Sequence, residues 1–400
     1  MPRSTPSRPA SPPDWSVYAL VAITWVATRV MAVVSVDMTP WMLNDLEIYL
    51  SWVPGLQSGV FPTGDPTWQY PPGIGPLFVL SDSLGVEFRW GFTLVILAVD
   101  AALMGMLLVA RARRSTASMR GPWLWAAAGL VVGPIMVTRF DVVPTALAAL
   151  AVLLVARPIL SGAAAALGAA TKVWPAFMLI VLPRRSLPRG LLGFVITGAT
   201  LLVAALVLGR DALSFLSNQQ SRGLQVESVG ALPYEVWSLL GNEVSFRYQY
   251  GSIQVDMAGA ETVGLVVTVV GVLLLGGLLV ARLAGRLEAA APGDVALTVM
   301  LVSVATSRVY SPQFNVWLVG LAAVALLDSR TRLRAVVAIV VVVSVLTQVV
   351  YPWSATQLVS GDAFTIAVQA LRIVGLILAA ALGLRAILQR PTAVATGMVG

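Results

Sequence analysis

Apolar stretches of about 18 residues or more recur along almost the whole chain. A helix of that length spans the roughly 30 Å hydrocarbon core of a bilayer and satisfies its own backbone hydrogen bonds where water is absent. Hydrophobic residues make up 58% of the 400 residues and charged residues only 11%, whereas ordinary globular domains carry about a quarter charged residues. The pattern predicts an all-α polytopic membrane protein.

The apolar runs predict twelve spanning or re-entrant segments. They cover residues 15–36, 87–110, 122–138, 142–157, 159–171, 174–182, 190–208, 258–281, 293–307, 313–327, 335–350 and 363–384. Twelve crossings place both termini on one side of the membrane. No cleavage-type boundary follows the first apolar run, so residues 1–14, rich in Pro and Ser, are predicted to be a disordered cytoplasmic tail. Residues 15–390 are then one transmembrane domain, and 391–400 a second cytoplasmic tail.

The distribution of charge orients these segments. With the N-terminus in the cytoplasm, the cytoplasmic tails and loops hold 17 of the 26 basic residues and 4 of the 19 acidic ones. This positive-inside bias accounts for the net charge of +7 without a nucleic-acid partner. Nine basic residues remain on the outer side or in the membrane, where a charge is costly and marks a functional candidate. These are Arg29, Arg89, Arg139, Lys172, Arg210, Arg222, Arg247, Arg308 and Arg372.

Two long connections, at about 37–84 and 210–257, lie on the outer side in this topology. Within the first, NDLEIYLSWVPGLQSG alternates apolar and polar residues at helical spacing, with Asn44 as a candidate N-cap. This pattern predicts a short amphipathic helix along the membrane interface. The second connection contains similar short amphipathic pieces.

An Asp-x-Glu pair, Asp45 and Glu47, follows the first membrane segment. Two residues apart on a helix, the two carboxylates cannot share a face, so at most one is expected to point at a substrate. The pattern is common in long proteins, and its place at the outer end of the first segment is what makes it informative.

Two short stretches carry charges where helices meet the outer side. TRFDVVP, at 138–144, contains Arg139 and Asp141, for which the alternative to a functional role is a local ion pair. Lys172, the only lysine, stands in a break between two short segments, and such breaks are tolerated where they line a polar cavity. The alternative for Lys172 is a snorkelling interfacial lysine, although the chain uses arginine at every other basic position.

Three further charges, Arg29, Asp100 and Arg372, lie deep within apolar segments. A buried charge in a bilayer needs a partner. We therefore expect Asp100 to form an intramembrane ion pair with Arg29 or Arg372.

Six motifs, in order, resemble glycosyltransferase family 87. They are D-x-E-x-Y from Asp45, YPPG from Tyr70, RFD from Arg139, TKVWP from Thr171, SRGLQVESV from Ser221 and SRVYSPQFNVWL from Ser307. The resemblance covers residues 15–385. It implies a GT-C-type bundle of about 11–12 membrane segments, with short amphipathic helices in the extracytoplasmic loops and an extracytoplasmic active site. The family is best known for polyprenyl-phosphate-mannose-dependent mannosyltransferases of bacterial envelope glycolipids.

The resemblance also implies roles for individual residues. An acid of the first outer loop acts as base, which maps to Asp45, with Glu47 beside it. Guanidinium groups hold phosphate oxygens in a fork and an ammonium acts as a point charge. The candidates for the donor phosphate are therefore Arg139, Lys172, Arg222 and Arg308, and those for the substrate pocket are Tyr70, Asp141 and Gln313. Some relatives use a histidine near the site, and this chain has none.

The predicted activity is an inverting transfer of a sugar, most of all mannose, from a polyprenyl phosphate to a hydroxyl of an envelope glycolipid or lipoglycan. The expected partners are this donor, that acceptor and the lipids of a bacterial plasma membrane. Without Cys, His or an Asp-x-Asp motif in the short cytoplasmic loops, we expect no cofactor and no metal. Two alternatives stay open: transfer of arabinofuranose from a polyprenyl phosphate, and a lipid or sugar transporter or flippase, which would favour inverted repeats.

Overall fold

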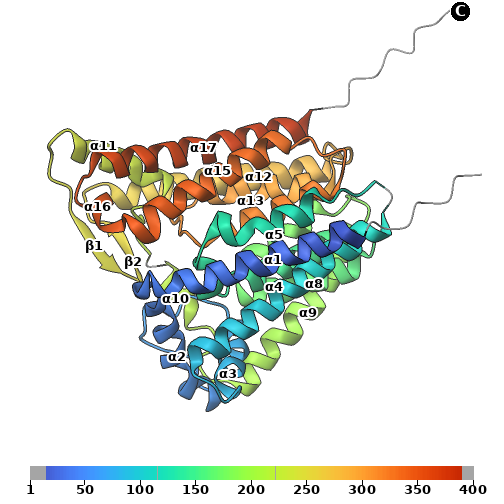
Figure 1. The fold of residues 1–400 in the computed structure, drawn as a ribbon, viewed down its shortest axis with the longest axis horizontal. Coiled ribbons are helices and arrows are strands. Elements are labelled where there is room, and N and C mark those ends of the chain that lie inside the picture. The colour runs from blue at the N-terminus through green and yellow to red at the C-terminus, as the bar shows by residue number, and fades with distance from the viewer. Residues whose placement is uncertain (1–14, 115, 221, 390–400) are drawn as a thin grey trace, which may run out of the picture.

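The computed structural model describes residues 15–114, 116–220 and 222–389, which form a bundle of helices (Figure 1). Six helical segments of this described part are long and apolar enough to cross a membrane. These are α1 (Trp15–Asp37), α4 (Phe88–Arg113), α9 (Leu187–Leu208), α12 (Ala260–Leu283), α15 (Arg334–Gln348) with its continuation η5 (Val349–Trp353), and α17 (Ala363–Leu388). The shorter apolar helices are α7 (Val142–Leu153), α8 (Pro158–Thr171), α13 (Pro292–Ala305) and α14 (Phe314–Leu327). The predicted tails 1–14 and 391–400 lie outside the described residues.

The helices agree with the predicted segments to within a few residues at most ends. The run predicted at 122–138 is divided between α5 (Arg120–Val132) and α6 (Ile135–Thr138), with Gly133 at positive φ between them. The run predicted at 174–182 is the 3-10 helix η3 (Trp174–Val181). The all-α polytopic membrane architecture is confirmed.

The two kinds of helix differ in what surrounds them. The long helices expose large aliphatic side chains, such as Val203 and Leu206 on α9 and Leu273 and Val280 on α12. A bilayer solvates such faces, whereas water does not. By contrast, α14 is buried almost throughout, and it packs with α13 against α5, α7, α15 and α17. The short helices therefore form the centre of the bundle.

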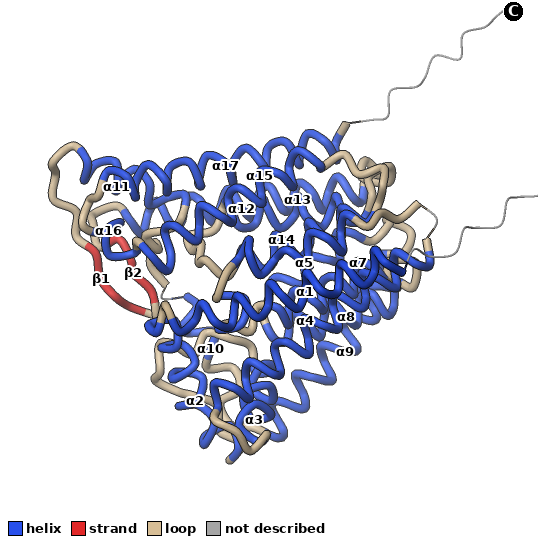
Figure 2. The backbone as a smooth tube through the Cα atoms, viewed as in Figure 1, coloured by secondary structure: helices blue, strands red, loops and turns tan. Residues whose placement is uncertain are grey.

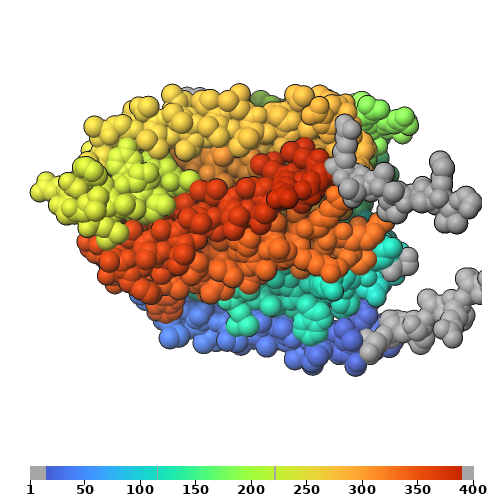
Figure 3. Space-filling view, turned by 90° about the horizontal axis from the view of Figure 1, so that it is seen from above, coloured from blue at the N-terminus to red at the C-terminus, as the bar shows by residue number. Residues whose placement is uncertain are grey.

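The elements that do not span gather at one end of the bundle (Figure 1, Figure 2). They are η1 (Pro40–Leu43), α2 (Asn44–Gln57), η2 (Pro72–Ile74), α3 (Gly75–Ser83), α10 (Phe215–Gln220), η4 (Val229–Ala231), α11 (Leu232–Leu239), β1 (Phe246–Gln249), β2 (Ser252–Val255) and α16 (Ala355–Val359). At the opposite end α1 begins and α17 ends. A view turned by 90° shows α11 projecting at the first of these ends, next to α17 (Figure 3).

One intramembrane ion pair joins α1 to α4. Arg29 Nε lies 2.7 Å from Asp100 Oδ2, and Trp25 Nε1 donates to the same oxygen at 2.9 Å. The remaining guanidinium hydrogens reach backbone carbonyls of α5, so both buried charges are satisfied. The expected pairing of Asp100 with Arg29 is confirmed, and Arg372 has a different partner, described below.

Two local expectations were wrong. Asn44 does not cap α2, because the helix begins at this residue and the position before it, Leu43, makes no side-chain cap bond. The second outer loop contains an antiparallel hairpin, β1–β2, in place of helical pieces alone. Its turn places Tyr250 and Gly251 at positive φ, the conformation that two-residue hairpin loops favour.

Candidate active site

A cavity of about 700 Å³ lies at the end of the bundle where the elements that do not span gather. Its walls come from α2, the stretch before η2, the break after α8, the segment from α10 to the hairpin, and the turn between α13 and α14. Most of the residues predicted for the site line it. These are Asp45, Tyr70, Arg139, Lys172, Arg222, Arg308 and Gln313. The exceptions are Glu47 and Asp141.

Helix α2 presents one face to the cavity. Asp45, Ile48, Tyr49 and Trp52, at helical spacing, all line the cavity. Because Glu47 is two residues from Asp45 on the helix, its side chain points away from the cavity. Glu47 is exposed on the other side of the helix. Of the two carboxylates, Asp45 lines the cavity and Glu47 does not.

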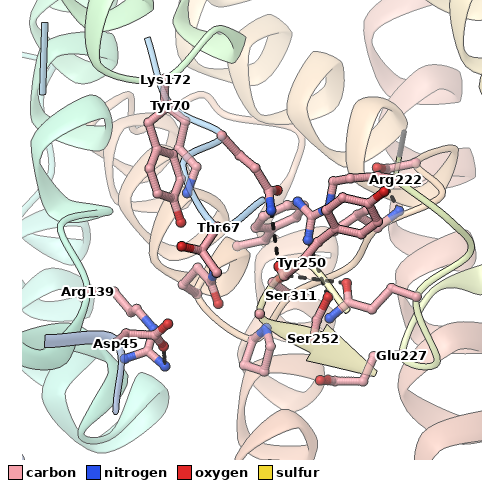
Figure 4. Close-up of a pocket in the computed structure, with 18 of the residues that line it drawn as sticks. Asp45, Thr67, Tyr70, Arg139, Lys172, Arg222, Glu227, Tyr250, Ser252 and Ser311 are labelled. Atoms are coloured by element: carbon pink, nitrogen blue, oxygen red, sulfur yellow. Dashed lines mark hydrogen bonds and ion pairs between the residues drawn. The ribbon is translucent and has the colours of Figure 1, made fainter. Parts of the chain in front are cut away.

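Asp45 is held by Arg139, as Figure 4 shows at one side of the cavity. Arg139 Nη2 pairs with Asp45 Oδ2, while its Nη1 donates to the carbonyls of Met42 at 3.1 Å and Thr138 at 3.0 Å. Arg139 is 6% exposed and Asp45 29%, so the pair stands at the cavity wall with the carboxylate facing the open space. The alternative of a local pair between Arg139 and Asp141 is wrong.

Lys172 pairs with Asp141 behind the cavity wall. Its Nζ lies 2.7 Å from Asp141 Oδ1, an oxygen that also accepts a hydrogen bond from Trp317 Nε1 at 2.6 Å. Four aromatic rings surround the ammonium at 4.9–5.8 Å from their centroids: Tyr70, Phe140, Phe314 and Trp317. Burial lowers the pKa of Lys172, and the charge of Asp141 opposes that shift. This enclosed amine does not have the geometry of a snorkelling lysine.

Arg222 and Arg308 differ from these two cations, since neither has a carboxylate partner in the described part of the chain. Arg222 Nη2 lies 3.4 Å from the Ser252 hydroxyl, and Arg308 Nη2 donates to the Gln219 carbonyl at 2.9 Å. Burial and then the nearby charge of Arg308 lower the pKa of Arg222. Two neighbouring guanidinium groups without a counter-ion make this wall of the cavity attractive to an anion.

Tyr70 completes the wall between the two groups of cations. Its ring packs edge-on against Phe140, with centroids 4.8 Å apart. Burial, followed by the negative charges of Asp45 and Asp141, raises the pKa of the Tyr70 phenol, so it stays protonated and can donate a hydrogen bond. Gln313 lies at the start of α14 and also faces the cavity.

The sequence did not single out two groups of cavity residues. One is Glu227, whose Oε2 accepts from Arg372 Nη1 at 2.8 Å and which lies on the side of the cavity opposite Asp45 (Figure 4). The other is the stack of Phe314 on Trp317, with centroids 3.9 Å apart. Both groups belong to motifs quoted above, SRGLQVESV and SRVYSPQFNVWL. Their place in these motifs was the sequence signal that could have identified them as cavity residues.

An apolar groove of about 620 Å³ adjoins the cavity. It lies between η2, α3, α8 and α9, and its lining is almost entirely Gly, Ala, Pro, Val, Leu and Phe, with Gln57 as the polar exception. Three residues, Pro71, Val173 and Phe215, line both the groove and the cavity. The polar cavity and the apolar groove therefore adjoin each other at these residues.

Metal ligands are sparse in this region. Within residues 15–389, leaving aside 115 and 221, no three His, Cys, Asp or Glu side chains come together in a group that could hold a metal ion. The charged groups of the cavity are those already named.

Comparison with known proteins gives one match. The family model for glycosyltransferase family 87 matches residues 68–232, a stretch that includes Tyr70, Arg139, Lys172 and Arg222. No curated protein and no solved structure showed significant similarity to the chain. The match confirms the resemblance found in the sequence: residues 68–232 of this chain, whose helices make it a multi-pass membrane protein, are similar to glycosyltransferase family 87.

Proposed function

We propose that this protein transfers a sugar, most of all mannose, from a polyprenyl phosphate to a hydroxyl of an envelope glycolipid or lipoglycan, with inversion at the anomeric carbon. The cavity end of the bundle faces the extracytoplasmic side of a bacterial plasma membrane in this proposal, with both termini in the cytoplasm. The positive-inside distribution of arginines supports that orientation.

One observation supports this reaction above the others: a single cavity holds a carboxylate at one wall and, at another, two guanidinium groups that have no counter-ion among the described residues. The carboxylate is Asp45, and the guanidinium groups belong to Arg222 and Arg308. Transfer from a sugar phosphate needs both, because a proton leaves the acceptor while negative charge develops on the departing phosphate.

In the proposed step, the acceptor hydroxyl oxygen attacks the anomeric carbon, and the bond from that carbon to the phosphate oxygen breaks. The proton passes to Asp45, whose Oδ1 has no hydrogen-bond partner among the described residues, while Oδ2 is fixed by Arg139. The phosphate leaves with the electron pair, and Arg222 and Arg308 stabilise its charge. Attack on one face by a single base inverts the configuration, so a β-linked donor gives an α-linked product.

The apolar groove supports a donor carried on a lipid. A polyprenyl chain lying in the groove would bring its phosphate past Pro71 and Val173 into the cavity. Lys172, the neighbour of Val173 in the sequence, lines the cavity at this point. In this arrangement Arg222 and Arg308 contact the phosphate. Lys172 and Arg139 contribute to the electrostatic potential of the site through their ion pairs. Arabinofuranose on the same lipid would use the same groups. A transfer assay with each of the two donors therefore distinguishes mannose from arabinofuranose.

The test is Asp45→Asn, which keeps the size of the side chain and removes its basicity. We expect transfer from polyprenyl-phosphate-mannose to fall by roughly 10²- to 10⁴-fold, with donor binding and expression preserved. Glu47→Gln is the matched control, since it makes the same kind of change two residues away on the exposed face of α2. Full transfer activity in Asp45→Asn would remove Asp45 as the base.

A further inference from the structure

Glu227 places a second carboxylate in the cavity. It lies on the side opposite Asp45 (Figure 4), and it is 7% exposed. A carboxylate repels phosphate, so the space directly beside Glu227 does not suit the donor's leaving group. It suits a ligand rich in hydroxyl groups, because an ionised carboxylate accepts short, strong hydrogen bonds from O–H donors.

The Glu227 side chain is fixed by one oxygen only. Oε2 accepts from Arg372 Nη1 at 2.8 Å, and the other oxygen, Oε1, has no hydrogen-bond partner within the described residues. Arg372 is 0% exposed, and it also donates to Gln369 Oε1 at 2.9 Å and lies with its guanidinium carbon 4.2 Å from the Tyr310 ring centroid. The guanidinium therefore holds Glu227 in one orientation and leaves an acceptor oxygen for a ligand.

The backbone that carries Glu227 is equally constrained. Gln225 N donates to the Arg308 carbonyl at 3.0 Å, and Val226 N donates to the Ile253 carbonyl in β2 at 3.0 Å. Ser228 N closes a turn to the Gln225 carbonyl at 3.0 Å. A side chain fixed at both its base and its tip binds with little loss of conformational entropy, which is the condition for a specific contact.

Tyr351 lines the same cavity, near both carboxylates. Its hydroxyl is 3.4 Å from Arg139 Nη2, and it lies within range of the charges of both Asp45 and Glu227. The cavity therefore has an acceptor at each of two sides, Asp45 and Glu227, and a phenol near both. This is the mixture of donors and acceptors that a sugar ring requires.

We infer that Glu227, oriented by Arg372, binds a ring hydroxyl of the acceptor sugar and so selects the acceptor and positions it toward Asp45. This inference rests on the proposed function, and it adds a specificity-determining residue that does not touch the donor phosphate.

The experiment uses the purified full-length protein with polyprenyl-phosphate-mannose as donor and octyl α-D-mannoside as acceptor. Glu227→Gln preserves an oxygen for Arg372 and removes the charge. We expect KM for the octyl mannoside to rise roughly ten- to a hundredfold, the loss for one hydrogen bond to a charged group. The KM for the donor, and the slow hydrolysis of the donor by water, should stay within about twofold.

A matched variant separates this role from a structural one. Glu235→Gln changes a carboxyl of the same cluster that is fully buried next to Gln369 and does not line the cavity. If Glu227 only neutralised Arg372, the two variants would share one phenotype, such as reduced yield with unchanged KM values. Octyl mannosides that lack one ring hydroxyl each provide a second readout. The removal of one particular hydroxyl should raise KM in the wild type and have no further effect in Glu227→Gln.

The outcomes are distinct. An unchanged acceptor KM in Glu227→Gln, or an increase in the KM of the donor in its place, would overturn the inference and leave the proposed reaction standing. A wild-type protein that neither transfers nor hydrolyses the donor would overturn the proposed function, and the inference with it.

Discussion

The cavity and the groove adjoin each other and differ in chemistry. The cavity is lined by charged, amide, hydroxyl and aromatic side chains, whereas the groove is lined by small and aliphatic ones over a similar volume, about 700 against 620 Å³. The two meet at Pro71, Val173 and Phe215. An amphiphile with a charged head and a long apolar tail matches this pair of spaces, whereas a free sugar or a nucleotide sugar would use only the first. The following changes test that division.

The largest effect is expected from the cavity. Replacing Arg222 and Arg308 together by Ala removes the two cavity guanidinium groups that have no carboxylate partner in the described part of the chain. Transfer should fall by at least roughly a hundredfold, because preorganised cations stabilise the departing phosphate. The loss should be the same for polyprenyl and for short-chain donors, as measured by steady-state kinetics with both. A loss restricted to long-chain donors would contradict the division of roles.

At the boundary between the two spaces, Lys172→Met is expected to act on stability first. It leaves Asp141, 1% exposed, without its cation, and breaking a buried pair costs about 3–5 kcal/mol. Thermal unfolding in detergent should show the loss, and the added change Asp141→Asn should recover most of it. Failure of the second change to restore stability would mean that Lys172 has a role other than pairing with Asp141.

In the groove, Gly198→Trp is expected to slow transfer from long-chain donors and to leave transfer from short-chain donors unchanged. A Cβ at Gly198 meets no atom within 4 Å, so the indole can occupy the groove without displacing the backbone. We expect the transfer rate to fall roughly tenfold with a polyprenyl donor and to stay unchanged with a short-chain one. Gly276→Trp is the matched control, because Gly276 also has open space but lies on the exposed face of α12. Equal effects of the two variants would exclude the groove as the chain site.

The smallest effect concerns a carboxyl that lines neither space. Burial raises the pKa of Glu235 from 4.5 to about 8, so the folded protein retains a proton that the unfolded chain releases above about pH 5. Stability from this source is complete below pH 4.5 and is lost as the pH rises through 8. Melting temperatures from pH 6 to 9 should therefore fall by a few degrees more in the wild type than in Glu235→Gln. Parallel curves would show that Glu235 does not titrate in this range.

The sequence predicted the helices well because each apolar run must close its own hydrogen bonds in lipid. The distribution of charge also predicted that the two long connections lie on the same side, and the structure places Asp45 and four of the predicted cations around one cavity. The pairing of charges was harder to predict. Arg139 and Asp141 are two residues apart in sequence, yet each pairs with a residue from another part of the chain, Asp45 and Lys172. Such partners depend on helix packing, which sequence spacing does not specify.

Two other features escaped prediction for local reasons. The β1–β2 hairpin is eight strand residues long in total, and its alternating pattern in SFRYQYGSIQVD is short enough to be mistaken for an amphipathic helix. Glu227 stood within a recognised motif, but its partner Arg372 is 145 residues away. Only the fold shows that the guanidinium deep in α17 supports a cavity residue.

The three residues shared by cavity and groove have a consequence for turnover. For a donor that binds as proposed, the polyprenyl phosphate that remains after transfer can leave through the groove into the surrounding bilayer. It then does not cross the space that the acceptor occupies. Release of the polyprenyl phosphate and retention of the glycosylated acceptor are then independent events. Repeated addition to one glycan would need only lateral exchange of carriers, at a pace set by lipid diffusion and by the composition of the membrane.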